Sequence, residues 1–379
     1  MMRVALAVAL IGCSAPDALV ADAWTAPDAG SDVGSDAGTD AGSDGGSDAG
    51  TDAGPSGLTW IESARVDGCY GEPVLTSNGD GWALWWPDCP FAPHLLELDE
   101  AGHVGASLAL PAPPAGAIAS AIMPTSVVFA HDTYALGGNA YPPTETTLFA
   151  PFIATLDRTG ASPGWIAVTD ASSANLEGWD ETPGWWSTEG STLVLRDASL
   201  REVSRSMLAM DGGELARGPH DALVWEQSRL ARIAPDGAVT PLALTTVTPY
   251  DAVAWNDGFL VTAWSADHMG LDLVIVDAPG SADVRAHMPG PRGPLPSIAA
   301  MPERDRAAIC WVEQQSGDAF VYSVQLMDVA AGERIGAPTV VHVDGAWVGG
   351  PSCAWGGTHL LYAWSTTLGT VVASYVLTP

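Results

Sequence analysis

The sequence contains no lysine, and positive charge is scarce: 14 arginines stand against 45 acidic residues, for a formal net charge of −31 at pH 7. A field of this sign repels phosphate backbones and argues against nucleic-acid binding. Helical periodicity is nearly absent, which argues against an α or α/β fold. The sequence also lacks a nucleophile elbow, a phosphate loop and a dinucleotide fingerprint, so no catalytic motif stands out.

Metal and redox signatures are missing too. The eight histidines never occur at a spacing such as His-x-His or His-x3-His, and no two cysteines form a Cys-x-x-Cys pair. A folded channel could still gather separated residues, but the sequence itself predicts neither a metal nor a cofactor.

The first twelve residues have the form of an export signal. One arginine, Arg3, precedes an uninterrupted apolar run from Val4 to Ile11. Eight residues are too few to cross a hydrocarbon core, which needs about 20, so the run is interpreted as a signal region. An alternative is ordinary signal cleavage after residues 21–23, Ala-Asp-Ala.

The signal region ends in Leu10-Ile11-Gly12-Cys13, which resembles the lipobox of bacterial lipoproteins. The resemblance implies that Cys13 becomes the lipidated N-terminus, and several acyl chains anchor a protein stably. Ser14 follows the cysteine, which in the best-known sorting rule favours the outer membrane. We therefore expect a cell-envelope protein whose lipid contacts the membrane.

Residues 13–57 form the expected anchor and linker. Aspartates recur every fourth residue from Asp28 to Asp52, among Ala, Gly, Ser and Thr and a single valine. The repeat has no apolar group to bury and its charges repel, which predicts disorder. A calcium-binding β-roll would need an apolar residue in each repeat. Similar Asp-Ala-Gly tracts look typical of lipoproteins from high-GC bacteria such as the myxobacteria.

A short apolar strand recurs through residues 58–379 and predicts the fold. Seven copies end near Trp86, Gly137, Leu195, Trp225, Trp264, Trp311 and Trp364. From Trp86 to Trp364 the seven copies are on average about 46 residues apart, a spacing that fits four-stranded propeller blades. Each copy but the last precedes a turn built from Asp and usually Gly, as in Asp99 to Gly102. We predict an all-β domain, a β-propeller of seven blades; the degenerate repeats of 175–245 leave six or eight open.

The two ends of the domain complement each other. The seventh copy stops at its third strand, residues 371–377, and a spare strand-like stretch, residues 58–62, precedes the first copy. Propellers are often closed by a blade that takes strands from both ends of the chain, which removes an exposed edge. We therefore expect the N-terminal strand to complete the last blade.

Four cysteines remain besides Cys13, an even number that suggests two disulfides in an exported chain. Three connectivities are open, and the repeat favours pairing Cys69 with Cys89 and Cys310 with Cys353. The first two flank the strand of the first copy, and the second two lie on successive copies.

One stretch combines aromatic side chains with carboxylates outside the repeat: Trp179, Asp180, Glu181, Trp185 and Trp186. Exposed, these residues would suit sugar stacking or a protein contact. The alternative is that they pack inside an irregular third blade. Glu226 and Glu313 follow repeat tryptophans and would either face the channel or cap strand ends.

The sequence leaves the function open between three classes. We expect a monomeric propeller that binds a protein or glycan partner rather than catalysing a reaction. The alternatives are a polysaccharide-acting hydrolase or lyase with its site in the funnel, and a structural scaffold in envelope assembly. Polar and charged side chains converging in one mouth of the channel would favour the enzyme, whereas an apolar patch with exposed tryptophans would favour a partner surface.

Overall fold

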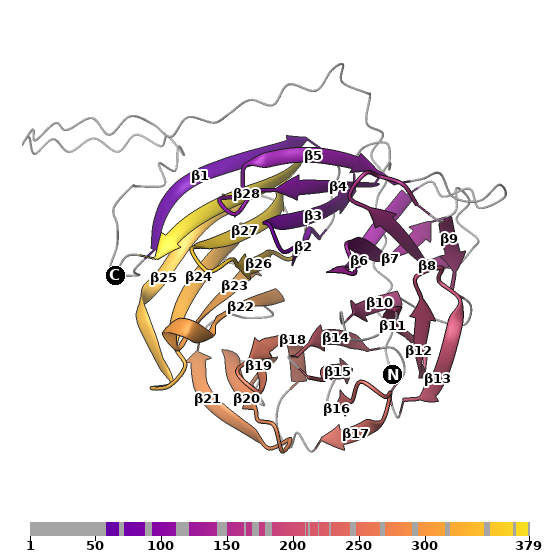
Figure 1. The fold of residues 1–379 in the computed structure, drawn as a ribbon. Helices are drawn as coiled ribbons and strands as arrows, with labels where there is room; N and C mark the ends of the chain where they lie inside the picture. The colour runs from indigo at the N-terminus through magenta and orange to yellow at the C-terminus, as the bar shows by residue number, and fades with distance from the viewer. Residues whose placement is uncertain are drawn as a thin grey trace, which may run out of the picture.

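The computed structural model describes residues 58–67, 72–87, 93–110, 121–141, 150–162, 164–168, 174–178, 184–208, 210, 213–218, 220–226, 229–242, 248–265, 270–289, 295–314, 319–344, 349–366 and 369–377. They form seven four-stranded antiparallel sheets arranged as blades around a central axis (Figure 1). The predicted β-propeller and its seven blades are confirmed.

The first six blades each take four consecutive strands, ordered from the axis outwards. The first three blades are β2 (Val74–Ser77), β3 (Trp82–Pro87), β4 (Pro93–Leu98), β5 (Val104–Ala109); β6 (Ala121–Ala130), β7 (Thr133–Tyr141), β8 (Ala150–Asp157), β9 (Gly164–Ala167); and β10 (Ala174–Gly178), β11 (Gly184–Glu189), β12 (Thr192–Asp197), β13 (Glu202–Met207). The next three are β14 (Glu214–Arg217), β15 (Ala222–Glu226), β16 (Arg229–Ile233), β17 (Val239–Leu242); β18 (Thr248–Trp255), β19 (Gly258–Trp264), β20 (Gly270–Val276), β21 (Ala282–Pro289); and β22 (Leu295–Met301), β23 (Arg306–Gln314), β24 (Phe320–Asp328), β25 (Glu333–Asp344). A short 3-10 turn, η1 (Pro302–Arg304), lies between β22 and β23.

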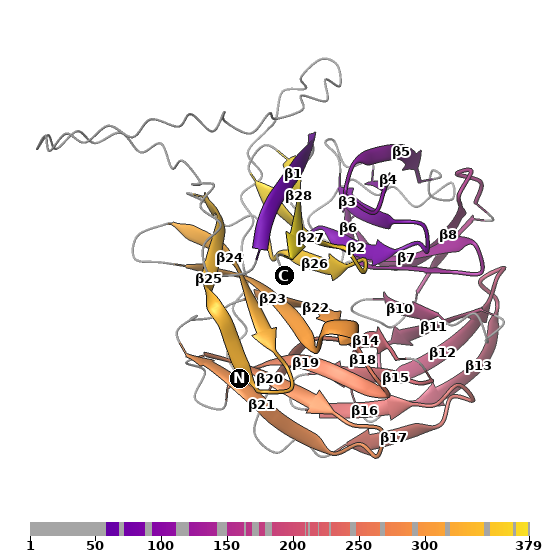
Figure 2. The same cartoon turned by 60° about the vertical axis from the view of Figure 1, so that its left-hand side comes forward.

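The seventh blade closes the ring with strands from both ends of the chain. It consists of β26 (Ser352–Trp355), β27 (His359–Thr366), β28 (Gly369–Leu377) and, outermost, β1 (Leu58–Asp67). β1 pairs antiparallel with β28 from Leu58 opposite Leu377 to Asp67 opposite Gly369. The expected closing strand is therefore confirmed, and the two ends of the domain lie side by side in Figures 1 and 2.

Aspartate turns join the third and fourth strands of several blades, as predicted. In the first blade, Asp99 Oδ1 accepts the backbone N–H groups of Ala101 and His103, both at 2.9 Å. Gly102 follows with a positive φ of 90°, which costs a glycine little. The degenerate turn at Asp197 keeps the same two hydrogen bonds, but Leu200 takes the left-handed position with a φ of 61°.

The hydrophobic core is divided among the seven spaces between neighbouring blades. The repeat residues Trp225, Trp311 and Trp364 are buried there, as expected for sheet-to-sheet packing. The assignment of the third copy is wrong in position, because residues 192–195 of this copy lie on β12, the third strand of its blade. The second strand is β11, whose buried Ser187 and Thr188 hide it from an apolar pattern.

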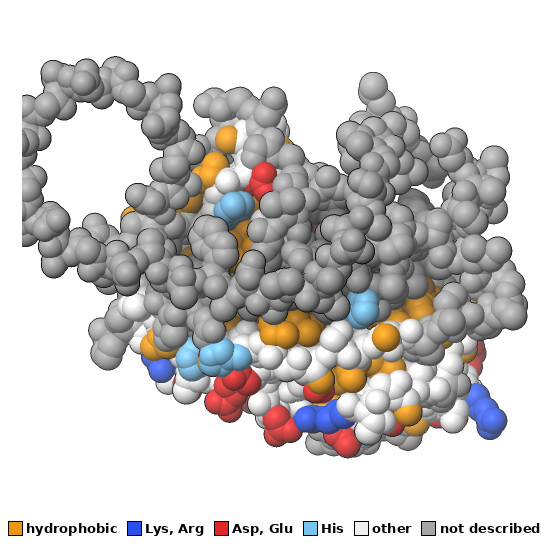
Figure 3. All heavy atoms as spheres, turned by 90° about the horizontal axis from the view of Figure 1, so that it is seen from above, with side chains coloured by type: hydrophobic (Ala, Val, Ile, Leu, Met, Phe, Trp, Pro, Cys, Tyr) orange, Lys and Arg blue, Asp and Glu red, His pale blue; other side chains and the backbone are white. Residues whose placement is uncertain are grey.

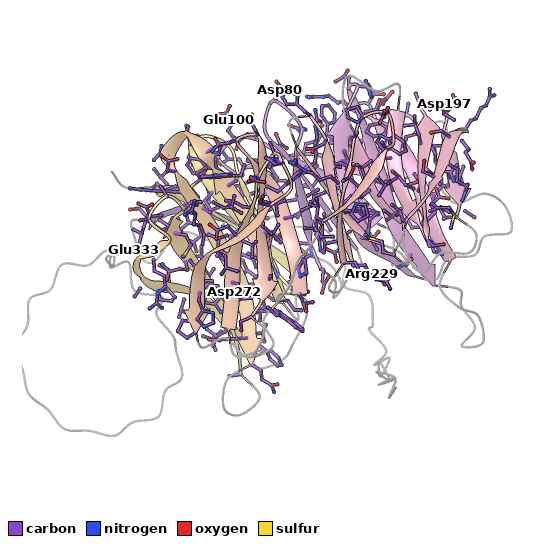
Figure 4. All side chains as sticks on the ribbon, turned by 90° about the horizontal axis from the view of Figure 1, so that it is seen from below. Asp80, Glu100, Asp197, Arg229, Asp272 and Glu333 are labelled. Carbon is purple, nitrogen blue, oxygen red and sulfur yellow. The ribbon has the colours of Figure 1, made fainter. Side chains whose placement is uncertain are left out.

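The strand order distinguishes the two faces of the ring. Every inner strand begins at one face, which we call the mouth face, and ends at the other, the turn face, where it turns into the second strand. The aspartate turns also lie at the turn face, and Figure 4 shows Asp80, Glu100 and Asp197 along this rim, with Arg229 towards the other. Among the described residues no helix is long and apolar enough to span a membrane.

Candidate site in the central channel

The tryptophans singled out in the third blade belong to the core. Trp185 and Trp186 are each 1% exposed on β11. Successive side chains of a strand point to opposite faces, so Trp185 packs between the second and third blades and Trp186 between the third and fourth. Both indoles are therefore enclosed between blades, where a ligand cannot stack on them. This agrees with the alternative that they pack inside the third blade. Trp179, Asp180 and Glu181 lie outside the described residues.

Of the other residues predicted from the sequence, some lie outside the described residues and some lie within them. Cys13, Cys69 and Cys89 lie outside the described residues. Cys310 and Cys353 are buried free thiols. Glu226, opposite Arg229 in the β15–β16 pairing, and Glu313 on β23 do not line the channel.

The described surface shows no aromatic docking patch. Its large exposed hydrophobic side chains are Val104, Val203, Met207, Val284, Val340 and Val343, all on outermost strands. None of the described tryptophans is among them. On the face shown in Figure 3, hydrophobic side chains occur in small groups among polar and charged ones. Nothing on this part of the surface favours a flat apolar interface over the channel.

The inner strands of all seven blades enclose a cavity of about 730 Å³ along the axis. This volume lies within the usual range of ligand sites, about 300–1,000 Å³. Acidic side chains from four blades line it: Glu72, Glu177, Glu214 and Asp251. Arg217 is the one basic residue in the described lining. Polar groups that are far apart in sequence therefore converge in one channel.

A recurring hydrogen bond joins successive inner strands. A side-chain oxygen on one inner strand accepts a backbone N–H from the inner strand of the next blade. Serines accept it three times, at 3.1–3.2 Å: Ser126 from Leu176, Ser297 from Cys353, and Ser352 from Leu75. In the fifth blade Asp251 takes this place and accepts from Ile298 at 2.9 Å. Asp251 is thus part of the wall that holds the blades together.

Burial raises the pKa of Asp251 to about 6, although backbone and Ser297 hydrogen bonds stabilise its charged form and limit the rise. Asp251 is therefore mostly ionised at neutral pH. Its second oxygen, Oδ1, accepts the backbone N–H of Ala252 at 2.8 Å.

Glu214 differs from Asp251 because its carboxyl group accepts no hydrogen bond from another described residue. It is the first residue of β14, at the mouth face, where channel water reaches it although protein surrounds it on most sides. This enclosure raises the pKa of Glu214 to about 8, and the like charges of Asp251 and Glu72 add to the rise. At neutral pH Glu214 therefore carries a proton that it can donate.

Deeper in the channel, Glu177 and Arg217 form a second polar pair. Burial raises the pKa of Glu177 to about 7, and the positive charge and backbone N–H of Arg217 oppose this shift. The backbone N–H of Gly178 also donates to Glu177, at 3.1 Å. The channel thus holds one carboxyl group that titrates near neutrality beside a fixed positive charge.

Tyr250, next to Asp251, adds an aromatic hydroxyl to the same wall. Its ring stacks on Trp264 with centroids 6.1 Å apart, and burial raises the pKa of its hydroxyl, so it stays a donor. Among the described residues, no group of three His, Cys, Asp or Glu side chains could hold a metal ion.

Sequence reasoning missed these residues, although one signal was present. Proline stands one or two positions before the hydrogen-bonding residue in four blades: Pro124 before Ser126, Pro249 before Asp251, Pro296 before Ser297 and Pro351 before Ser352. This recurring pair lies on an inner strand or, in the seventh blade, at its first residue. Glu177 and Glu214 had no such signal.

No protein-family model matches the chain, and no curated protein matches it in sequence. Solved structures resemble it in shape. A KlHsv2 chain "with loop 6CD replaced by a Gly-Ser linker" superposes with a TM-score of 0.52 and 10% identity, over 77% of this chain and 88% of that one. The Neurospora crassa Pan2 WD40 domain gives 0.44 and 10%, over 68% and 89%. BamB from Moraxella catarrhalis gives 0.46 and 12%, over 84% and 99%. The likeness to the first of these is one of fold, and the chain is a seven-bladed β-propeller.

Proposed function

We propose that this chain is a lipid-anchored protein of the cell envelope that binds a protein or glycan partner through the mouth of its propeller channel. The observation that carries the proposal is Glu214, whose carboxyl group accepts no hydrogen bond from another described residue and opens into a channel of about 730 Å³. Ligand sites place a small number of polar groups in a cavity, so a carboxyl group that is open to the channel is suited to a ligand.

The composition of the channel favours a ligand that supplies hydrogen-bond donors or positive charge. The described lining contains four carboxyl groups and one guanidinium, and Asp251 is mostly ionised at neutral pH. An anionic polymer would meet repulsion at the mouth. Glu214 accepts a hydrogen bond from a ligand when ionised and donates one when protonated, and Tyr250 adds a second donor.

The proposed anchor fits this arrangement. Cys13 would carry the lipid, and the residues up to 57 would join it to β1, the outermost strand of the seventh blade. A disordered linker of about 44 residues spans about 35–40 Å. Changing Cys13 to Ala should release the chain from membranes, and unchanged fractionation would contradict the anchor.

The released Cys13→Ala chain is the reagent for testing the binding proposal. It serves as bait for native envelope extract and as probe on a glycan array. Glu214→Gln should weaken a captured interaction at least tenfold, whereas Glu333→Gln, an exposed acid on β25, should leave it unchanged. Silence in both assays, or equal binding by both variants, would contradict a channel-mouth partner site.

One observation favours the polysaccharide-acting enzyme as a second candidate. The pKa values of Glu214, about 8, and Asp251, about 6, are separated, as in sites that pair a general acid with a carboxylate. Release of reducing or unsaturated ends from envelope polysaccharide would show the activity. A general acid Glu214 would make the rate fall as the pH rises above about 8, and Glu214→Gln would abolish it.

A further inference from the structure

The two buried thiols meet at the seam where the ring closes. Cys310 lies on β23 of the sixth blade and Cys353 on β26 of the seventh, and Cys353 Sγ lies 4.0 Å from the backbone oxygen of Ala308, two residues before Cys310 on β23. Both are buried, in one core cluster with Leu58 of the closing strand β1. The thiols are thus held together by the packing of two different blades.

We propose that Cys310 and Cys353 are a modification site, at which oxidation forms a disulfide that links the sixth blade to the seventh. The two thiols give up two protons and two electrons to an external disulfide, which is reduced to two thiols. The product bond joins β23 to β26, which otherwise meet through apolar packing and through the contact of Cys353 Sγ with the backbone oxygen of Ala308.

The bond would form during folding rather than in the closed ring. The thiolate is the reacting form, and burial raises the pKa of the Cys310 thiol, so the native pair reacts slowly. In a partly folded chain both thiols are exposed and ionise more readily. Once the ring has closed, the same burial protects the disulfide from external thiols.

The position of the pair connects it to the channel. Cys353 lines the cavity, and Ser297, which accepts its N–H, also hydrogen-bonds Asp251. A fixed Cys353 would therefore hold one end of a chain of hydrogen bonds in the channel wall. This inference does not depend on the proposed ligand site, because the disulfide would stabilise the ring with or without a ligand.

Thiol labelling of the full chain exported to an oxidising compartment tests the proposal. The chain is unfolded in guanidinium without reductant, alkylated and digested after arginine, which separates Ala307–Arg334 from Ile335–Pro379. We expect these two peptides as one linked species, two hydrogen masses lighter than their sum, that separates after reduction. Alkylation of both Cys310 and Cys353 without reductant would overturn the proposal.

A stability measurement supplies an independent readout. In a chain carrying Cys69→Ser and Cys89→Ser, reduction should raise the unfolding constant by about 30-fold or more, the lower end of the usual effect of a disulfide. The same chain with Cys310→Ala and Cys353→Ala in addition should show no response to reductant. Equal unfolding with and without reductant in the first chain would contradict the bond.

Discussion

The titration of Glu177 should make the stability of the propeller depend on pH. Its pKa is raised from 4.5 to about 7, chiefly by burial, so the folded state holds the proton more tightly than the unfolded state does. The stabilisation is fully present below pH 4.5 and is lost as the pH rises through 7. Glu177→Gln keeps the shape and the neutral charge of the protonated acid and should not lose stability over this range.

The magnitude follows from the shift. A difference of about 2.5 pKa units corresponds to about 3.4 kcal/mol, of which about 2.5 kcal/mol would be lost between pH 5 and pH 8. Water in the channel screens the charge, so we expect the wild type to lose about 1–2.5 kcal/mol relative to Glu177→Gln over this interval. Glu214, which channel water reaches more freely, is a poorer choice for this calculation.

Urea unfolding of both proteins at pH 5, 6, 7 and 8 provides the assay. The difference between the two free energies of unfolding removes the general repulsion that a net charge of −31 adds as the pH rises. Glu333→Gln, on the exposed edge of β25, serves as the matched control and should follow the wild type at every pH. A wild-type-minus-Glu177→Gln difference that stays constant within about 0.5 kcal/mol would refute the buried titration.

Three further predictions concern packing and closure. Arg196→Met should lower the free energy of unfolding in urea by about 3 kcal/mol, because the buried Glu189 loses its main partner. The Glu189 side chain is 3% exposed and lies 2.6 Å from the Arg196 guanidinium. Recovery of the lost stability on adding Glu189→Leu would confirm the cause. Trp185→Ala should cost about 3–5 kcal/mol, the range for a fully buried indole, and a cost under 1 kcal/mol would contradict its core position. Removing residues 1–67 should lower the melting temperature by about 10 °C or more and promote aggregation, because β28 becomes an open edge, whereas removing 1–57 should change neither.

The fold was readable because its signals are local and repeated. Trp225, Trp311 and Trp364 recur on the second strands of the fourth, sixth and seventh blades, and the turn at Asp99 shows the hydrogen bonds that its residues favour. The closing strand could be predicted because a missing strand and a spare strand stand at opposite ends of one domain. The first two inferences need only residues that are close in sequence, and the third needs only a count of the strands in each copy.

The third blade was misread because its second strand is polar where the others are apolar. β11 buries Glu189, which pairs with Arg196 on β12. The second half of β11 therefore does not follow the apolar repeat. The adjacent Trp185 and Trp186 looked irregular for the same reason. Their alternation between two blade interfaces becomes visible only when both neighbouring blades are in place.

The channel residues could not be predicted from spacing, because closure of the ring brings them together. Glu72, Glu214 and Asp251 come from the first, fourth and fifth blades: Glu72 precedes β2, whereas Glu214 and Asp251 lie on β14 and β18. The perturbed pKa of Glu214 results from this convergence and from enclosure. No local motif encodes either cause.

Substitutions of Asp251 can distinguish its structural role, the hydrogen bond to the next blade, from its electrostatic effect on Glu214. Serine occupies the equivalent place in three other blades and accepts the same interblade hydrogen bond, so Asp251→Ser should keep the link to Ile298. It removes the like charge beside Glu214, whose pKa should fall from about 8 towards its ordinary value. Carboxyl titration by NMR measures the shift, with Asp251→Ala as the variant that loses both link and charge. If the pKa of Glu214 stays at about 8 in Asp251→Ser, enclosure alone raises it, and the two carboxyl groups do not act as one acidic site.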